Sequence, residues 1–161
     1  MGRIKQGVGS DILAERHSTN SAIDGFEKLS DILVVEDNPI DGDRMRATLH
    51  LSVGRHAKIR RAETLASALD RVIEKMPDLI ILDDYLKPND TATDTIPYLQ
   101  KAGFTGPIIV ISGEVNRQRR IELVSLGASD VLHKDDVDSV QIKAALDRVM
   151  KLSAAGEARV S

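Results

Sequence analysis

Four short apolar runs, each closed by polar side chains, dominate the pattern of this chain. The runs and the groups that close them are Asp31–Val35 with Glu36 and Asp37, Leu79–Leu82 with Asp83 and Asp84, Ile108–Ile111 with Ser112, and Val131–Leu132 with His133 and Lys134. Short runs rich in β-branched residues are typical of buried strands in a parallel sheet. Because the carboxyl ends of parallel strands meet at one edge, we expect these polar groups to lie close together there.

Segments with helical periodicity separate these runs. Helices are expected from Asn38–Pro39 to about His50, from Leu65 to Met76, from Ile96 to near Gly103, from about Val115 to Leu126, and through Ile142–Met150. Ala57 and Ile59 mark a weak additional strand. The alternation of strands and helices, with right-handed crossovers, predicts an α/β fold with a doubly wound, five-stranded parallel sheet.

Three segments fall outside this regular alternation. Residues 1–30 mix Gly, Ser, Asn and charged residues without a sustained period, which predicts an N-terminal extension or arm. The folded domain is expected over residues 31–152, followed by a short C-terminal tail at 153–161. Inside the domain, Leu86–Thr95 is long and polar for a strand-to-helix loop, whose usual length is ~2–6 residues. A loop of that size beside a site often has a role in it.

Composition narrows the classes of function. Aromatic residues make up only 2% of the 161 residues, so the core must consist of Leu, Ile, Val, Ala and Met. The absence of cysteine excludes disulfides, thiolate catalysis and cysteine-ligated metals. A net charge of -3 argues against nucleic-acid or membrane binding by charge alone, and no apolar segment is long enough to span a membrane. We therefore expect a cytoplasmic protein, and we interpret Arg117, Arg119 and Arg120 as a solvated helix face.

The expected strand-end cluster suits phosphoryl transfer. Glu36, Asp37 and Asp83 would repel one another in one crevice unless a cation joined them, and an all-oxygen site of this kind favours Mg²⁺. The ammonium group of Lys134 would add one more positive charge. A metal and a lysine can neutralise phosphoryl oxygens while a carboxylate attacks phosphorus, and Ser112 could donate a hydrogen bond to one of those oxygens.

Four motifs in this order resemble one family. The segments ILVVEDNP, PDLIILD, PIIVISG and GASDVLHK, which begin at Ile32, Pro77, Pro107 and Gly127, are similar to the receiver domain of two-component response regulators. The resemblance covers roughly residues 31–152. It implies a flavodoxin-like (βα)5 fold with strand order 2-1-3-4-5.

The resemblance also implies roles for individual residues. Glu36 and Asp37 would hold Mg²⁺, Asp83 would accept the phosphoryl group, and the backbone carbonyl of Tyr85 would complete the metal ligands that the protein supplies. Ser112 would be the switch hydroxyl and Lys134 the lysine that contacts the phosphate.

Several positions depart from the family pattern. Val131 stands where the family usually has an aromatic residue, and Asp135 replaces the usual proline after the lysine. The proline that follows the acceptor is displaced to Pro88, which leaves two candidates for the phosphoacceptor. Counting back from Pro88 selects Asp84, whereas counting forward from Pro77 selects Asp83. We favour Asp83, because shifting a strand register costs more than inserting one loop residue.

The resulting hypothesis is a stand-alone, single-domain response regulator rather than an enzyme. Its partners would be a sensor histidine kinase or a histidine phosphotransfer protein, and a homodimer is a further possibility. Two alternatives stay open. One is a receiver-like interaction module that does not depend on phosphorylation. The other is a haloacid-dehalogenase-type phosphatase, which would need a second acid two residues after its nucleophile, where Tyr85 or Leu86 stands.

Overall fold

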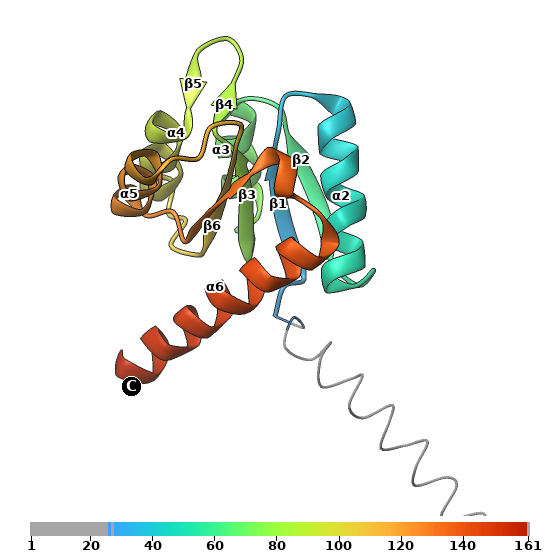
Figure 1. Cartoon of the computed structure of the whole chain (residues 1–161), viewed down its shortest axis with the longest axis vertical. Coiled ribbons are helices and arrows are strands. Elements are labelled where there is room, and N and C mark those ends of the chain that lie inside the picture. The colour runs from blue at the N-terminus through green and yellow to red at the C-terminus, as the bar shows by residue number, and fades with distance from the viewer. Residues whose placement is uncertain (1–25, 27, 161) are drawn as a thin grey trace, which may run out of the picture.

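A five-stranded parallel sheet forms the centre of the molecule (Figure 1). The computed structural model describes residue 26 and residues 28–160, with side chains up to residue 151. In the order in which they lie, the strands are β2 (Lys58–Ala62), β1 (Asp31–Val35), β3 (Leu79–Asp83), β6 (Ile108–Ser112) and β7 (Asp130–His133). This order confirms the predicted doubly wound, flavodoxin-like topology.

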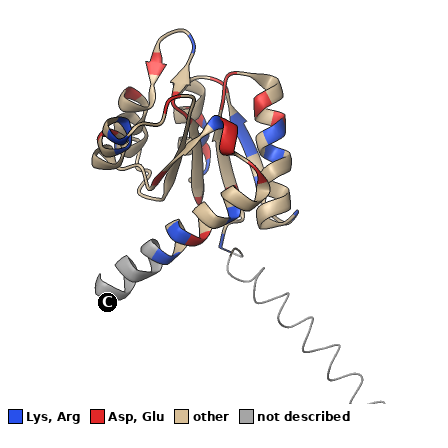
Figure 2. Ribbon diagram, in the orientation of Figure 1, with Lys and Arg blue, Asp and Glu red and all other residues tan. Residues whose placement is uncertain are grey.

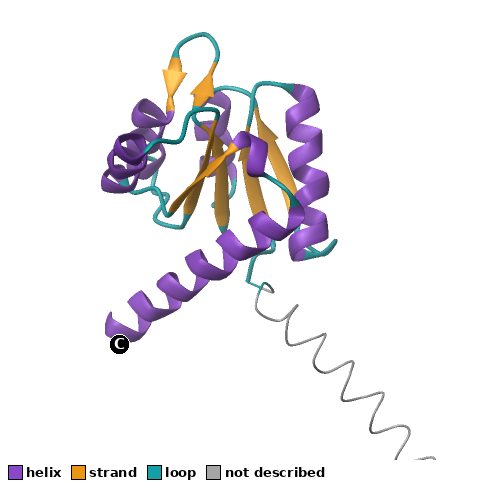
Figure 3. Ribbon diagram, in the orientation of Figure 1, coloured by secondary structure: helices purple, strands orange, loops and turns teal. Residues whose placement is uncertain are grey.

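Helices cover both faces of the sheet, as Figure 3 shows. The helices are α2 (Pro39–Val53), α3 (Leu65–Glu74), α4 (Ala92–Lys101), α5 (Arg117–Leu126) and α6 (Ser139–Val160), with a short 3-10 turn, η1 (Lys134–Asp136), between β7 and α6. Helices α2 and α6 pack together on one face, and α3, α4 and α5 lie on the other. Two caps explain where helices begin: Asn38 accepts hydrogen bonds from the first turn of α2, and Thr64 forms a capping box with Ser67 at α3.

The central strands are buried on both faces because their side chains alternate between two apolar layers. In β1, Leu33 and Val35 join the layer beneath α3, α4 and α5, whereas Ile32 and Val34 join the layer beneath α2 and α6. This burial explains why the strands appear in the sequence as continuous apolar runs. Helix α3 packs through Ala68 and Val72, which are buried, whereas Ile73 remains 72% exposed.

The folded unit begins before the predicted boundary at residue 31. Phe26 and Leu29 are 3% and 1% exposed and pack in the layer beneath α2 and α6. Most of the predicted N-terminal arm, residues 1–25 and 27, lies outside the described residues. At the other end, helix α6 continues to Val160, through residues that the sequence pattern assigned to a tail. Among the described helices, none has the length and apolar character needed to cross a membrane.

The long connection after β3 is a hairpin rather than an irregular loop. Strands β4 (Tyr85–Leu86) and β5 (Asp90–Thr91) pair antiparallel, and α4 begins directly after β5. Figure 1 shows the hairpin projecting from the edge of the sheet at which β3 ends. The hydroxyl of Tyr85 donates a hydrogen bond to the carbonyl of Pro88, at 2.7 Å, across the turn. The hairpin therefore extends beyond the carboxyl end of β3.

Candidate functional site

Three carboxylates meet at the carboxyl edge of the sheet. Strands β1 and β3 pair side by side, with Val35 opposite Leu82, so the residues that follow each strand are neighbours. Each of Glu36, Asp37 and Asp83 offers an oxygen within 4.8 Å of the others. Glu36 and Asp83 are buried, and Asp37 is half-buried. The strand-end pattern in the sequence correctly anticipated that these acids lie together.

Lys134 reaches the same crevice from the end of β7. Its Nζ lies 3.3 Å from Oδ1 and 3.4 Å from Oδ2 of Asp83. Burial lowers the pKa of Lys134, but the negative charges of Asp83 and Glu36 outweigh it, so the pKa is raised above its usual value. The ammonium group is therefore charged and directed at the carboxylate of Asp83.

One lysine does not balance the three acids. Burial first, and then the neighbouring Asp83 carboxylate, raise the pKa of Glu36 to about 8. The crevice therefore disfavours a further negative charge unless a cation neutralises it. A set of carboxylate oxygens this close together fits a hard divalent cation such as Mg²⁺, which prefers oxygen ligands and keeps several waters.

A cavity of about 470 Å³ adjoins the acidic crevice. Glu36, Asp83 and Lys134 line its polar part, and Met45, Ile81 and Val137 line its apolar part. The cavity gives the Asp83 carboxylate access to molecules that approach from outside. Ser112 is not among its lining residues.

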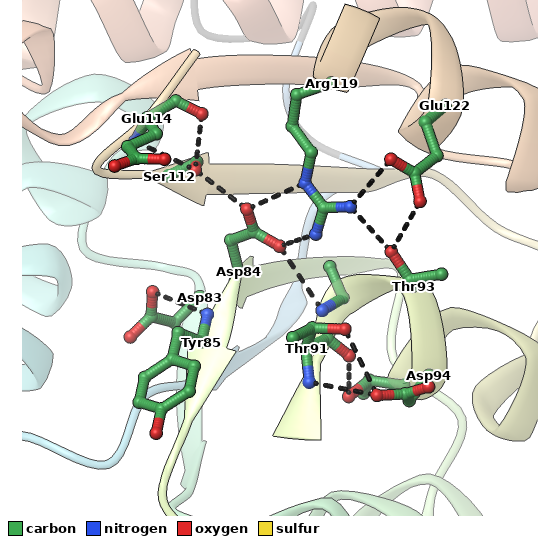
Figure 4. A network of polar contacts seen from close by, with 12 residues as sticks. Asp83, Asp84, Tyr85, Thr91, Thr93, Asp94, Ser112, Glu114, Arg119 and Glu122 are labelled. Carbon is green, nitrogen blue, oxygen red and sulfur yellow. Dashed lines mark hydrogen bonds and ion pairs between the residues drawn. The ribbon is translucent and has the colours of Figure 1, made fainter. Parts of the chain in front are cut away.

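Asp84 lies in a separate polar network. Its Oδ2 accepts a hydrogen bond from the Ser112 hydroxyl at 2.8 Å and another from Nε of Arg119 at 3.2 Å. Nη2 of Arg119 forms an ion pair with Oδ1. Burial raises the pKa of Asp84, yet the hydrogen bonds from Arg119 and Ser112 outweigh it and bring this pKa below its usual value. Figure 4 shows that the carboxylates of Asp83 and Asp84 point in different directions, as expected for adjacent residues at the end of a strand.

The remaining predicted site residues surround this arrangement. Ser112 is buried at the end of β6, and its hydroxyl contacts Asp84 and the carbonyl of Glu114. The backbone N–H of Tyr85 donates a long hydrogen bond, 3.4 Å, to Oδ1 of Asp83. Lys87 in the hairpin similarly donates its N–H to Oδ2 of Asp37, at 3.4 Å. The hairpin is thus linked to the acidic crevice through its backbone.

The interpretation of the basic residues on α5 (Figure 2) as a solvated face holds for Arg117, which is exposed, but needs correction for Arg119. The Arg119 side chain is only 19% exposed and pairs with Asp84 and Glu122, while Arg120 pairs with Asp130. The charge pattern does not reveal these contacts, because the sequence around an arginine on a short helix is the same whether the side chain is solvated or pairs with an acid far away in the chain. The signal that could have revealed Arg119 is the second strand-end acid, Asp84, which needs a cationic partner if it is half-buried.

Comparisons with known proteins bear on the family and the fold. A family model of the response regulator receiver domain matches residues 32–147. No curated protein matches the chain. A similar solved structure is the chemotaxis protein CheY4 from Vibrio cholerae, with 21% identity, a TM-score of 0.65, and coverage of 75% of this chain and 98% of that chain.

Two further structures resemble the chain. The BeF3-activated receiver domain of RstA from Klebsiella pneumoniae has 25% identity and a TM-score of 0.62, covering 74% of this chain and 97% of that chain. A response regulator protein from Burkholderia pseudomallei, solved with a phosphorylated aspartic acid, a calcium ion and citrate, has 24% identity and a TM-score of 0.62. The match covers 82% of this chain and 75% of that chain. Because the family match spans most of the described domain and the fold has the same topology, the chain belongs to the response regulator receiver domain family.

Proposed function

We propose that this receiver domain accepts a phosphoryl group on Asp83 from a sensor histidine kinase or a histidine phosphotransfer protein. It would then signal by phosphorylation-dependent protein contacts or by phosphorelay. One observation carries the proposal: the Asp83 carboxylate lies with Glu36 and Asp37 beside the Lys134 ammonium, and it borders an open cavity. Receiver domains are phosphoacceptor signalling modules, so membership in the family supports the same function.

The transfer step assigns a task to each group. A carboxylate oxygen of Asp83 attacks phosphorus, and the P–O bond forms while the P–N bond to the donor histidine breaks. The histidine nitrogen leaves with the bonding electron pair. Lys134, 3.3 Å from Asp83, is positioned to neutralise phosphoryl oxygens as they arrive.

Mg²⁺ fits this site as the resident cofactor. Glu36, Asp37, Asp83 and the backbone carbonyl of Tyr85 would hold the ion. When bound, the ion supplies positive charge that neutralises phosphoryl oxygens in the transition state. The close approach of the carboxylates of Glu36, Asp37 and Asp83 supports this assignment, because like charges this near need a cation between them.

The proposed function predicts Mg²⁺-dependent uptake of phosphate. Wild-type protein should incorporate labelled phosphate from acetyl phosphate, and from phosphorylated histidine kinases, when Mg²⁺ is present. Uptake should fall to background when the metal is chelated. Release of the label by neutral hydroxylamine, which cleaves an acyl phosphate but not a phosphate ester, distinguishes the two. Label that forms equally well after chelation would contradict the proposed site.

Magnesium binding can also be observed without phosphorylation. Amide resonances of Asp37 and Tyr85 should shift on titration with Mg²⁺, with half-saturation on the order of millimolar because the protein supplies few ligands. Asp37→Asn should weaken the response severalfold. Asp70→Asn is the matched control, since Asp70 is an exposed acid on α3. An equal response in wild type and Asp37→Asn would remove Asp37 from the metal site.

A phosphorylation-independent interaction module is the second candidate, and one observation favours it. The Ser112 hydroxyl contacts Asp84 rather than opening toward the cavity. The uptake assay separates the two functions, because such a module would take up no label. A phosphatase of the haloacid-dehalogenase type gains no support, since Tyr85 occupies the place of its second acid and directs its hydroxyl to Pro88. Light scattering with and without beryllofluoride measures the mass of the particle in solution and so tests the predicted homodimer.

A further inference from the structure

The hydroxyl of Ser112 forms hydrogen bonds with groups outside the acceptor site. It lies 2.8 Å from Oδ2 of Asp84 and 3.0 Å from the carbonyl of Glu114, and it accepts the N–H of Glu114 at 3.2 Å. A serine hydroxyl carries one proton, so it can donate to one acceptor at a time. A carboxylate is the stronger of these two acceptors. The proton of Ser112 is therefore directed at Asp84.

Asp84 is itself fixed in place by Arg119. The guanidinium contacts both carboxylate oxygens, through Nε at 3.2 Å and through Nη2. Arg119 is anchored in turn by Thr93 Oγ1 at 2.7 Å and Glu122 Oε2 at 3.1 Å. The side chains of Arg119 and Asp84 are only 19% and 15% exposed, so solvent does little to weaken the pair. Figure 4 shows this network joining the first turns of α4 and α5 to the end of β6.

The position of the network links it to the acceptor. Asp84 follows Asp83 directly in the chain, and Ser112 ends the neighbouring strand, β6. A hydrogen bond from Ser112 to a phosphoryl group on Asp83 can form only after the bond from Ser112 to Asp84 breaks. Val131, on the next strand, is fully buried and apolar, so its side chain offers Ser112 no alternative polar contact.

We propose that Asp84 and Arg119 form a latch that holds the Ser112 hydroxyl away from the acceptor site in the unphosphorylated domain. Asp84 and Arg119 are thus positioning residues, which act through Ser112. When the latch breaks, the Ser112 hydroxyl moves toward Asp83. One hydrogen-bond acceptor site on Asp84 is then free, and the position of the Arg119 side chain in the first turn of α5 changes. The inference rests on the proposed function, because it assigns a control element to the same site.

The latch predicts a specific coupling between Asp84 and Ser112. Beryllofluoride, which mimics the phosphoryl group, should bind Asp84→Ala about tenfold more tightly than wild type, because one charge-assisted hydrogen bond no longer has to break. In the Ser112→Ala background, the same Asp84→Ala change should have little effect, since no hydroxyl remains to be released. Asp90→Ala is the matched control, because it removes a nearby negative charge from the hairpin.

The double-mutant comparison separates the latch from a simple charge effect. Removing Asp84 also leaves Arg119 without its partner, and the freed positive charge could attract the anionic mimic. That effect would persist in the Ser112→Ala background, and an equal gain in both backgrounds would overturn the latch. Unchanged affinity in Asp84→Ala would overturn it as well. If wild type binds no beryllofluoride, the proposed function fails, and the inference fails with it.

A measurement on the wild-type protein tests the latch even if the variants fail to fold. The Nε–H resonance of Arg119 should shift when beryllofluoride binds in the presence of Mg²⁺, because Nε shares Oδ2 of Asp84 with Ser112. Arg60 provides the control, since its Nε donates to Asp31 at 2.8 Å in a similarly buried pair at the opposite end of β1. A shift at Arg119 and not at Arg60 supports the latch. No shift at Arg119 in the saturated protein overturns it.

Discussion

Asp83→Asn is expected to abolish incorporation of labelled phosphate from acetyl phosphate, whereas Asp84→Asn should retain most of it. An asparagine at position 83 has no carboxylate oxygen to attack phosphorus, so uptake should fall by at least about a hundredfold. Asp84 lies outside the crevice, bound to Ser112 and Arg119, and its loss leaves the Asp83 nucleophile in place. Uptake is measured with Mg²⁺ at saturating acetyl phosphate, after circular dichroism has shown that both variants are folded.

The opposite pattern would move the acceptor by one residue. It would mean that the phosphoacceptor is located by counting back from Pro88 rather than by counting forward from Pro77. Asp70→Asn serves again as the control for loss of an exposed acid, and it should take up label like wild type.

Lys134→Ala is expected to remove the response to phosphorylation while leaving the fold intact. The Lys134 side chain is 41% exposed and, among the residues that the structure describes, its ion pair is with Asp83, so its loss should change the free energy of unfolding by no more than about 1 kcal/mol. Its ammonium is the positive side-chain charge that contacts Asp83. Without it, the amide shifts that beryllofluoride induces at Ser112 and along α5 should disappear at concentrations that saturate wild type.

A matched lysine separates function from general charge loss. Lys75 pairs with Asp31 at 3.4 Å, beside the amino end of β1, and its side chain is 65% exposed. Lys75→Ala should respond to beryllofluoride like wild type. A Lys134→Ala protein that unfolds, or that responds normally, would remove Lys134 from its proposed role.

The acidic crevice could be predicted from the sequence because strand ends in a parallel sheet converge by geometry alone. Once Leu33 and Ile80 are assigned to neighbouring buried strands, the acids that follow them must meet. Lys134 was predictable for the same reason, since β7 is parallel and its end lies at the same edge. These positions depend on strand order and register, which apolar runs define well.

The network around Asp84 could not be predicted in this way. Whether the Ser112 hydroxyl faces Asp83 or Asp84 depends on side-chain rotamers and on the position of the Arg119 side chain. Arg119 lies 35 residues beyond Asp84 in the sequence. The hairpin after β3 has strands of only two residues, too short for a period to appear. Phe26 and Leu29 fell within the predicted arm because residues 1–30 show no sustained period, although both pack into the core.

Reductive trapping of the phosphorylated wild-type protein tests the central claim most directly, because it needs no substitution. Borohydride reduces an aspartyl phosphate to homoserine, and peptide mass spectrometry then locates the changed residue. After incubation with acetyl phosphate and Mg²⁺, we expect homoserine at position 83, and aspartate unchanged at positions 84 and 37. Homoserine at position 84, or at neither position in a protein that has taken up label, would contradict the assignment of Asp83 as the phosphoacceptor.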